Sequence, residues 1–389
     1  MSEKIGENKK KIAVIASSRA TYGYKRKLIG LINNSQKLDL QLIVTGMHLM
    51  KDYGDSIDEI QQDGYPIISK LGFDLAKDTP ADWAKSIGKE IYGLAEIFEK
   101  IKPDIVLATG DRGEMFAVVA TAAYMNLPIA HIQSGDVSGH IDGSARHAMT
   151  KLSHIHFAAC EDSANRVIKM GEEPWRVFNV GAPQLDEIIH SKKIPKKDLE
   201  KILKLNLDKK PLLVIQHPVL VENENAYFQM KETMEALNLL KHPSIIVYPN
   251  IDSGGKNIIN AIREDENLPF IHTYKNIDRK VFMSLLGNTS AIVGNSSCGI
   301  LEAPSFKLPA INIGNRQRGR MQAINVINVG YKSEDIHQAI KKALYDDNFR
   351  NNLKTCENPY GDGFSSERIL KILEEIPLDA NLLDKKITY

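Results

Sequence analysis

The sequence predicts an α/β protein built from two doubly wound, Rossmann-like domains that face each other across a cleft. Three observations support this prediction. Short apolar runs alternate with helical patterns along most of the 389 residues, which is typical of parallel βαβ units. Nearly every apolar run ends in a polar, glycine-containing loop. A polar, lysine-rich stretch at residues 191–197 divides the series into two halves.

The first half opens with a buried strand at residues 11–17, a loop that contains Arg19, and a helix over residues 24–32. The loop lacks the Gly-x-Gly-x-x-Gly pattern, so a dinucleotide cofactor is not indicated. Arg19 is either a ligand for an anion or a solvated loop residue. The pattern predicts further strands at residues 40–44, 105–108, 129–132, 155–159 and 177–180, and a helix at residues 90–100.

Polar motifs follow the two central strands. One strand ends in Gly110, Asp111 and Arg112, and the next leads into residues 131–139 (HIQSGDVSG). We expect a helix to start at Ser144, with Arg146, His147 and Lys151 on its early turns. Each motif alone could be a helix cap or a packed histidine. Together, at the sheet edge where open α/β proteins bind ligands, they indicate a site for an anion and a polyol.

The second half repeats the pattern with strands at residues 211–215, 244–248, 291–293 and 309–313, each followed by a polar loop. Ser296 and Ser297 precede a helix, where they can hold a phosphate or simply cap the helix. Arg316, Arg318 and Arg320 can neutralise a diphosphate or lie in a solvated loop. We place a tail at residues 1–10, domains at 11–190 and 191–365, and a helix that packs back on the first domain at 366–389.

Composition excludes several classes of protein. Hydrophobic residues make up 43% and charged residues 25%, with a net charge of +1, so no basic surplus indicates nucleic acid or an anionic membrane as a partner. The cysteines at 160, 298 and 356 are too widely spaced for a disulfide framework or a zinc site. No stretch approaches the roughly 18 apolar residues of a membrane span, and the N-terminal residues lack a signal-peptide core. We expect a cytoplasmic protein.

Taken in order, the motifs resemble those of the hydrolysing UDP-N-acetylglucosamine 2-epimerases of the sialic and legionaminic acid pathways. The resemblance covers residues 12–372 and rests on the motifs above together with residues 216–219 (QHPV), 248–252 (YPNID), 294–299 (GNSSCG) and 314–317 (GNRQ). It implies the two-domain arrangement of glycosyltransferase-B proteins. It also implies a UDP-sugar as the substrate, no metal or redox cofactor, and a homodimer.

The implied reaction removes UDP from UDP-N-acetylglucosamine by elimination across C1 and C2. Water then adds to the glycal and gives N-acetylmannosamine. Asp111 and Asp142 match the family's essential carboxylates, and we group Asp136, Gln133, Arg146 and His217 with them as the catalytic set. The residues that resemble the family's UDP-binding set are Arg19, Arg112, Asn250, Ser296, Ser297, Glu302 and Arg316.

The sequence departs from the family pattern at two places. Gln133 stands where the family usually has glutamate, so we expect Asp111, Asp136 and Asp142 to move protons and Gln133 to hold a hydroxyl or the acetamide. The first loop reads RATYGY from Arg19 where the family usually has an acid and a lysine. Its loss of charge leaves UDP-N,N'-diacetylbacillosamine as an alternative substrate. Further alternatives are a non-hydrolysing 2-epimerase, a glycosyltransferase and a nucleotide-sugar sensor without activity.

Overall fold

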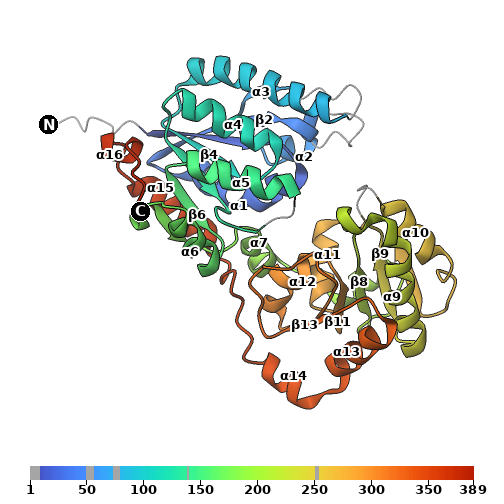
Figure 1. Ribbon diagram of the computed structural model, residues 1–389. Coiled ribbons are helices and arrows are strands. Elements are labelled where there is room, and N and C mark those ends of the chain that lie inside the picture. Colours follow the sequence, from blue (N-terminus) through green and yellow to red (C-terminus); the bar gives the residue numbers. More distant parts are fainter. Residues whose placement is uncertain (1–8, 50–56, 73–78, 138–139, 250–253) are drawn as a thin grey trace. The chain divides into compact units, whose positions relative to one another are not determined.

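The computed structural model describes residues 9–49, 57–72, 79–137, 140–249 and 254–389. The chain divides into two compact units (Figure 1). Residues 1–189 and 360–389 form unit 1, and residues 190–359 form unit 2. Both units are parallel α/β structures, as the alternating pattern predicts.

Unit 1 contains, in its described residues, a seven-stranded sheet in the order β3-β2-β1-β4-β5-β6-β7, with every pair parallel. Successive strands are added toward one edge of the sheet from β1 to β3 and toward the other edge from β4 to β7. Ligands of open α/β sheets bind at this switch point, between β1 and β4. The strands are β1 (Lys10–Ala16), β2 (Leu38–Thr45), β3 (Ile67–Leu71), β4 (Ile105–Thr109), β5 (Ile129–Ile132), β6 (Ile155–Ala158) and β7 (Val177–Asn179).

Helices cover both faces of this sheet (Figure 1). Alternate residues of a strand point to opposite faces. Ile12 and Val14 of β1 therefore pack with α1 and α15, whereas Ala13 and Ile15 pack with α3 and α4. The helices are α1 (Arg19–Asn34), η1 (Gly46–Leu49), α2 (Ile57–Gln62), α3 (Pro80–Ile101), α4 (Gly113–Tyr124), α5 (His140–Leu152), α6 (Glu161–Lys169), η3 (Pro174–Arg176), α7 (Gln184–His190), α15 (Ser365–Glu375) and α16 (Ala380–Leu383).

Unit 2 contains, where the structure describes it, a six-stranded parallel sheet in the order β10-β9-β8-β11-β12-β13. Its strands are β8 (Leu212–Ile215), β9 (Ser244–Val247), β10 (Ile271–Tyr274), β11 (Ala291–Gly294), β12 (Ala310–Ile313) and β13 (Val326–Val329). Its helices are α8 (Lys196–Leu203), η4 (Leu220–Asn225), α9 (Ala226–Leu240), α10 (Gly255–Arg263), α11 (Arg279–Leu286), α12 (Cys298–Leu301), η5 (Ala303–Phe306), α13 (Ser333–Tyr345) and α14 (Asp347–Leu353). Leu212 and Val214 pack on one face of the sheet, and Leu213 and Ile215 on the other.

The segment that returns to unit 1 begins at Tyr360, earlier than residue 366. The carbonyl of Tyr360 accepts from the amide of Ala182 at 2.7 Å. The buried Asp186 carboxylate then accepts from the amides of Ser365 and Ser366 at 2.9 and 2.6 Å, which satisfies the first N–H groups of α15. We call residues 360–389 the returning segment.

Two helices begin earlier than the pattern indicates. α1 starts at Arg19 because Ser18 and Thr21 form a capping box in which each side chain bonds the other's backbone. α5 starts at His140 and not at Ser144, so Lys151 lies in its last turn and not on an early one. The expected start at Ser144 was wrong because residues 140–143, although polar and glycine-containing, are themselves helical.

The cysteines at 160, 298 and 356 are all buried free thiols. Among the helices that the structure describes, none combines the length and apolar character needed to cross a membrane.

Candidate active site

The carboxyl ends of β4 and β5 are tied together by a histidine. His131 is completely buried within β5, and its Nε2 lies 2.8 Å from the carbonyl oxygen of Gly110, directly after β4. Burial lowers the pKa of His131 to about 3, so the ring is neutral. His131 therefore supports the site from inside the sheet.

A tight turn follows β5, and we call residues 133–136 the 133–136 turn. Gln133 has φ +63° and Gly135 has φ +74°. A side chain at position 135 would collide with the carbonyl oxygen of Ser163, which explains the glycine. Arg166 of α6 donates from Nη1 to the carbonyl oxygen of Gly135 at 2.5 Å. The backbone of the turn is thus fixed by α6.

Arg146 joins this turn to Asp111. The arginine is 5% exposed and comes from the middle of α5. Its Nη1 donates to the carbonyl oxygen of Gln133 at 2.8 Å, and its Nη2 forms an ion pair with Oδ2 of Asp111. A guanidinium shared between a backbone carbonyl and a carboxylate fixes the direction of both. Asp111, Gln133 and Arg146, singled out from the sequence, therefore lie together.

Asp136 and Gln133 each contact a residue that the sequence analysis did not single out. Ser163 of α6 donates to Oδ1 of Asp136 at 2.7 Å. Gln133 donates from Nε2 to Oε1 of the buried Gln184 at 3.4 Å. Ser163 lies in the first turn of α6, after β6, and Gln184 begins α7, after β7. This position after a strand is the only feature of the sequence that could have marked them as site residues.

Other predicted residues of unit 1 lie elsewhere or outside the description. Arg112 is the residue directly before α4, and its Nε donates to Oε2 of Glu114 in the first turn of that helix at 3.3 Å. The side chains of Arg19 and Asp142 lie outside the described residues, although their backbones belong to the first turns of α1 and α5. Lys25 of α1 is fully buried with Nζ 2.5 Å from the carbonyl oxygen of Ile15, and burial lowers its pKa to about 7.

In unit 2 the ends of β8 and β11 are joined by Asn295. Its Oδ1 accepts from the amide of His217 at 2.7 Å, and its Nδ2 donates to the carbonyl of His217 at 2.8 Å. Asn295 is 1% exposed, so these bonds are shielded from water. The preceding Gly294 has φ +127° and runs against the backbone of Ile215, which leaves no room for a side chain. Asn295 belongs to the motif at residues 294–299, but the motif alone does not indicate this role.

The backbone carbonyl of Asn295 also receives the loop after β12. Gln317 donates to it from Nε2 at 2.8 Å, and Arg316 from Nη1 at 3.3 Å. Burial, with a contribution from Arg316, lowers the pKa of His217 to about 4. His217 is therefore neutral near pH 7, able to accept or donate one hydrogen bond but not to act as a cation. Asn295 thus contacts both residues, the backbone of His217 through its side-chain amide and Arg316 through its backbone carbonyl.

Ser296, Ser297 and Glu302 follow at the start and end of α12. Ser297 caps the helix through its backbone and not its hydroxyl, and Ser296 Oγ lies 3.5 Å from the amide of Cys298. Burial raises the pKa of Glu302 to about 7, against the nearby charges of Arg279 and Arg320. Within the described residues, Oε2 of Glu302 has no hydrogen-bond partner. Asn250 lies outside the described residues.

The two edges differ in what they can do chemically. Unit 1 presents carboxylates and an amide that suit proton transfer to and from a polar substrate. Unit 2 presents hydroxyls, a neutral imidazole and guanidinium groups that suit a polyanion. In the part of the chain that the structure describes, no three His, Cys, Asp or Glu side chains are arranged to hold a metal ion.

Two doubly wound units with polar strand ends define a protein of the glycosyltransferase-B-like class. A solved structure of this class, UDP-GlcNAc 2-epimerase from Neisseria meningitidis bound to UDP-GlcNAc, superimposes with a TM-score of 0.79 over 93% of this chain and 99% of that one, at 19% identity. Residues 31–374 match the family described as UDP-N-acetylglucosamine 2-epimerase, and the chain belongs to that family.

Two relatives match along nearly the whole chain. The UDP-N,N'-diacetylbacillosamine 2-epimerase (hydrolyzing) of Legionella pneumophila is 38% identical over 98% of this chain and 100% of its own length. The GDP/UDP-N,N'-diacetylbacillosamine 2-epimerase (hydrolyzing) of Campylobacter jejuni is 36% identical over 96% of this chain and 98% of its own.

Proposed function

We propose that this chain is a hydrolysing 2-epimerase that converts a UDP-linked 2-acetamido sugar into UDP and the free sugar epimerised at C2. The observation that carries the proposal is the arrangement of Asp111, Arg146 and Gln133 at the ends of β4 and β5. It occurs in a chain whose family is that of the UDP-N-acetylglucosamine 2-epimerases. A carboxylate fixed by a buried guanidinium is suited to take or give a proton at one defined place.

In the first proposed step a carboxylate takes the proton from C2 while the bond from C1 to the UDP oxygen breaks. The electrons of the C–H bond form the C1=C2 double bond of a glycal, and UDP leaves with the electrons of its bond to C1. Departure of UDP makes C1 electron-poor and so acidifies the proton on C2. Asp111, Asp136 and Asp142 are the residues proposed for this transfer.

In the second proposed step water adds across the double bond. Its hydroxyl joins C1 while a carboxylate takes the other proton of the water. A carboxylic acid gives a proton to C2 on the face opposite to the one that lost it. Gln133 cannot exchange a proton near pH 7, so we assign it to a hydroxyl or to the acetamide. Its contact with Gln184 supports this role, because a second amide orients the first.

The strand ends of unit 2 are proposed to bind UDP. Arg316 carries the charge that a diphosphate requires, and the hydroxyls of Ser296 and Ser297 can donate to phosphate oxygens. Glu302 is a buried carboxyl suited to accept from ribose hydroxyls. The remaining proposed contacts are His217, Arg19, Arg112 and Asn250.

The relatives favour UDP-N,N'-diacetylbacillosamine as the first substrate to test, ahead of UDP-N-acetylglucosamine. The resemblance of the sequence motifs had implied UDP-N-acetylglucosamine, with UDP-N,N'-diacetylbacillosamine as the alternative. The altered first loop contributes less to the choice than expected. Thr21, in place of the usual acid, is buried and closes the capping box of α1. The threonine at position 21 is therefore explained by its role in capping α1.

The experiment is a proton NMR time course in deuterated water with each of the two UDP-sugars. We expect UDP and a free 2-epimeric sugar that carries deuterium at C2 from at least one of them. Accumulation of an epimerised sugar still linked to UDP would show the non-hydrolysing reaction instead. Binding of both sugars without release of UDP would contradict the proposal and favour a sensor.

A further inference from the structure

Two of the carboxylates proposed to move protons are held by partners of different chemistry. Asp111 is paired with the guanidinium of Arg146. Asp136, in the 133–136 turn directly after β5, accepts through Oδ1 from the hydroxyl of Ser163 at 2.7 Å. Ser163 is 3% exposed and lies in the first turn of α6. A guanidinium and a hydroxyl respond differently when their partner gains a proton, so the two carboxylates are suited to different steps.

The hydrogens around Ser163 can be assigned while Asp136 is ionised. A serine hydroxyl carries one hydrogen, and here that hydrogen points to the carboxylate of Asp136. Oγ of Ser163 also lies 3.3 Å from Sγ of Cys160, the N-cap residue of α6. Burial raises the pKa of the Cys160 thiol, so its hydrogen stays on the sulfur near pH 7. The thiol therefore donates to Ser163, and Ser163 donates to Asp136.

The same three side chains accommodate a protonated Asp136 without any movement of the backbone. A carboxylic acid has a hydrogen to donate, and a serine oxygen can accept it. The hydrogen of Ser163 then turns to the sulfur of Cys160, which is a weak acceptor. Because a thiol is also only a weak donor, turning its hydrogen away sacrifices little. Asp136 thus keeps a hydrogen-bonded partner in both of its protonation states.

Asp111 has no such freedom in its contact with Arg146. A guanidinium has five donors and no acceptor, and it stays charged. A proton on Asp111 would remove the negative charge on which the ion pair depends. Asp111 therefore suits a base that begins the cycle ionised, whereas Asp136 suits an acid that begins it protonated. Environments that favour different protonation states in two carboxyl groups are what divides an acid from a base.

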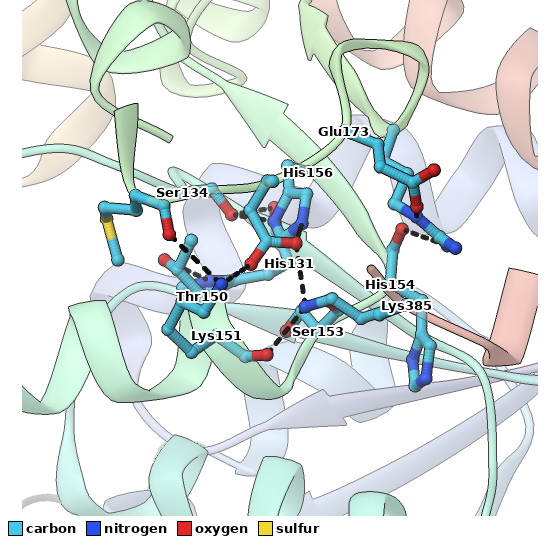
Figure 2. A network of polar contacts seen from close by, with 12 residues as sticks. His131, Ser134, Thr150, Lys151, Ser153, His154, His156, Glu173 and Lys385 are labelled. Carbon is cyan, nitrogen blue, oxygen red and sulfur yellow. Dashed lines mark hydrogen bonds and ion pairs between the residues drawn. The ribbon is translucent and has the colours of Figure 1, made fainter. Parts of the chain in front are cut away.

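The other hydroxyl of the turn has a different task. Ser134 donates to the carbonyl oxygen of His131 at 3.0 Å, within the buried network shown in Figure 2. Its Oγ lies 3.4 Å from Nδ1 of His156, and Nε2 of that ring lies 3.1 Å from the carboxylate of Glu172. Lys385 of the returning segment pairs with Glu172 at 2.8 Å. The single hydrogen of Ser134 is thus committed to the backbone, and it is the hydroxyl from α6 that reaches a carboxylate.

We propose that Asp136 is the acid that gives a proton to C2 in the second step, that Asp111 is the base of the first step, and that Ser163 is the positioning residue that holds Asp136 in both protonation states. This assignment rests on the proposed function. It deepens that function by dividing the two carboxylates between the two steps.

In the proposed cycle Asp111 takes the proton from C2 as the bond from C1 to the UDP oxygen breaks. The O–H bond of Asp136 breaks next, and its proton forms the new C–H bond at C2 with the electrons of the C1=C2 double bond. Ser163 then turns its hydrogen to the carboxylate left behind. Water adds its hydroxyl to C1 and gives its other proton to a third carboxylate of the proposed set. After the products leave, Asp111 and that third carboxylate lose their protons to solvent, and Asp136 regains one.

The first test follows the fate of the sugar by proton NMR in deuterated water, with the UDP-sugar from which the wild type releases UDP. Asp136→Asn keeps the shape of the side chain but cannot give a proton. We therefore expect UDP release with the sugar left mainly as the glycal, identified by the vinylic proton on C1. An Asp136→Asn enzyme that forms epimer in the wild-type proportion would overturn the assignment. So would one that binds UDP but releases none from the sugar, because Asp136 would then act in the first step.

Ser163→Ala tests the hydroxyl with Asp136 still present. We expect the ratio of glycal to epimer to rise about tenfold, as for loss of one hydrogen bond to a group that becomes charged, with KM little changed. Ser163→Thr keeps a hydroxyl and should restore the wild-type ratio. The matched control is Ser153→Ala, because Ser153 is also buried in unit 1 but donates to a backbone carbonyl, that of Met149, at 2.8 Å. Its ratio should equal that of the wild type.

A lower kcat in Ser163→Ala with an unchanged ratio of glycal to epimer would leave Ser163 a purely structural role and overturn the proposal. In the double variant, Ser163→Ala should add nothing to the product pattern of Asp136→Asn, because the hydroxyl acts through that carboxyl group. A further change in the pattern would contradict this. If the wild type releases UDP from neither sugar, the proposed function fails and the assignment fails with it. If the wild type forms the epimer and neither variant shifts the ratio, the assignment alone fails.

Discussion

The strand-end edges of the two units are held in shape by different chemistry. In unit 1 the neutral His131 joins the ends of β4 and β5, and charged groups make the links beside it, as Arg146 does with Asp111 and Arg166 with the 133–136 turn. In unit 2 a neutral side chain joins the two strand ends, because Asn295 bonds both backbone groups of His217, and Arg316 adds one charged bond to the carbonyl of Asn295. A charged link responds to protonation, whereas an amide does not titrate. The comparison teaches that charged links hold the residues proposed to move protons, whereas the edge proposed to hold the nucleotide depends mainly on the side-chain amides of Asn295 and Gln317.

The largest expected effect is on the charged edge. Asp111→Asn keeps the shape but removes the charge that pairs with Arg146, so we expect kcat to fall about 1,000-fold, within the usual range for loss of an acid or base. KM should change only a few-fold. Release of UDP in a coupled assay measures both. The control is Asp58→Asn, at an exposed position of α2. An Asp111→Asn enzyme with more than a tenth of the wild-type rate would show that this edge does not depend on charge.

The next effect concerns the rim of unit 2. Arg316→Ala removes a guanidinium proposed to meet the diphosphate, and we expect UDP affinity to fall about thirtyfold, as for a hydrogen bond to a charged group. Calorimetric titration of UDP measures this change. Arg318→Ala, an exposed arginine in the same loop, should change affinity less than twofold. Equal effects from the two variants would mean that general positive charge, and not position, attracts UDP.

A smaller effect is expected at the neutral link. Asn295→Ala leaves the amide and carbonyl of His217 without these partners, which should cost about 1–3 kcal/mol of stability and weaken UDP binding about tenfold. The matched control is Asn325→Ala, because Asn325 is also buried and bonds two carbonyls, of Gly299 and Leu308. Chemical denaturation and UDP titration should show similar losses of stability but loss of affinity only at Asn295. Unchanged UDP affinity in Asn295→Ala would show that the contacts of Asn295 with His217 do not support UDP binding.

The smallest expected effect tests buried charge in unit 1. Burial raises the pKa of Glu90 to about 8, with Glu114 adding to the shift and Thr45 opposing it. A raised carboxyl pKa in the folded state means that the protonated form of Glu90 stabilises the fold relative to the unfolded chain. Its stabilising contribution is complete below the unfolded pKa of about 4.3 and is lost as pH rises through about 8. Wild-type Tm should therefore fall between pH 7 and 9 by about 3 °C more than that of Glu90→Gln. Scanning calorimetry gives both slopes, and parallel slopes would refute this assignment.

The sequence predicts the alternation of strands and helices well because strands that helices cover on both faces bury every side chain, and so appear as short continuous apolar runs. It also places Asp111 and Gln133 at neighbouring strand ends, since parallel strands end at one edge. The start of α5 was missed because residues 140–143 read locally as a loop. The contacts of Asn295 with His217 and of Lys385 with Glu172 were out of reach, because residues so far apart in sequence are paired only by the completed fold.

The return of the chain to unit 1 has a consequence for its synthesis. Unit 2 is one continuous segment, and the stretches that flank it meet where a side chain at Gly181 would lie 3.0 Å from the carbonyl oxygen of Tyr360. All of unit 2 is therefore synthesised before the returning segment. The buried cluster of unit 1 that contains Leu28 and Ile32 of α1 is complete only when Ile369 and Leu373 of α15 have been synthesised. The part of the protein that is started first is thus finished last, and this cluster lacks its α15 members throughout the synthesis of unit 2.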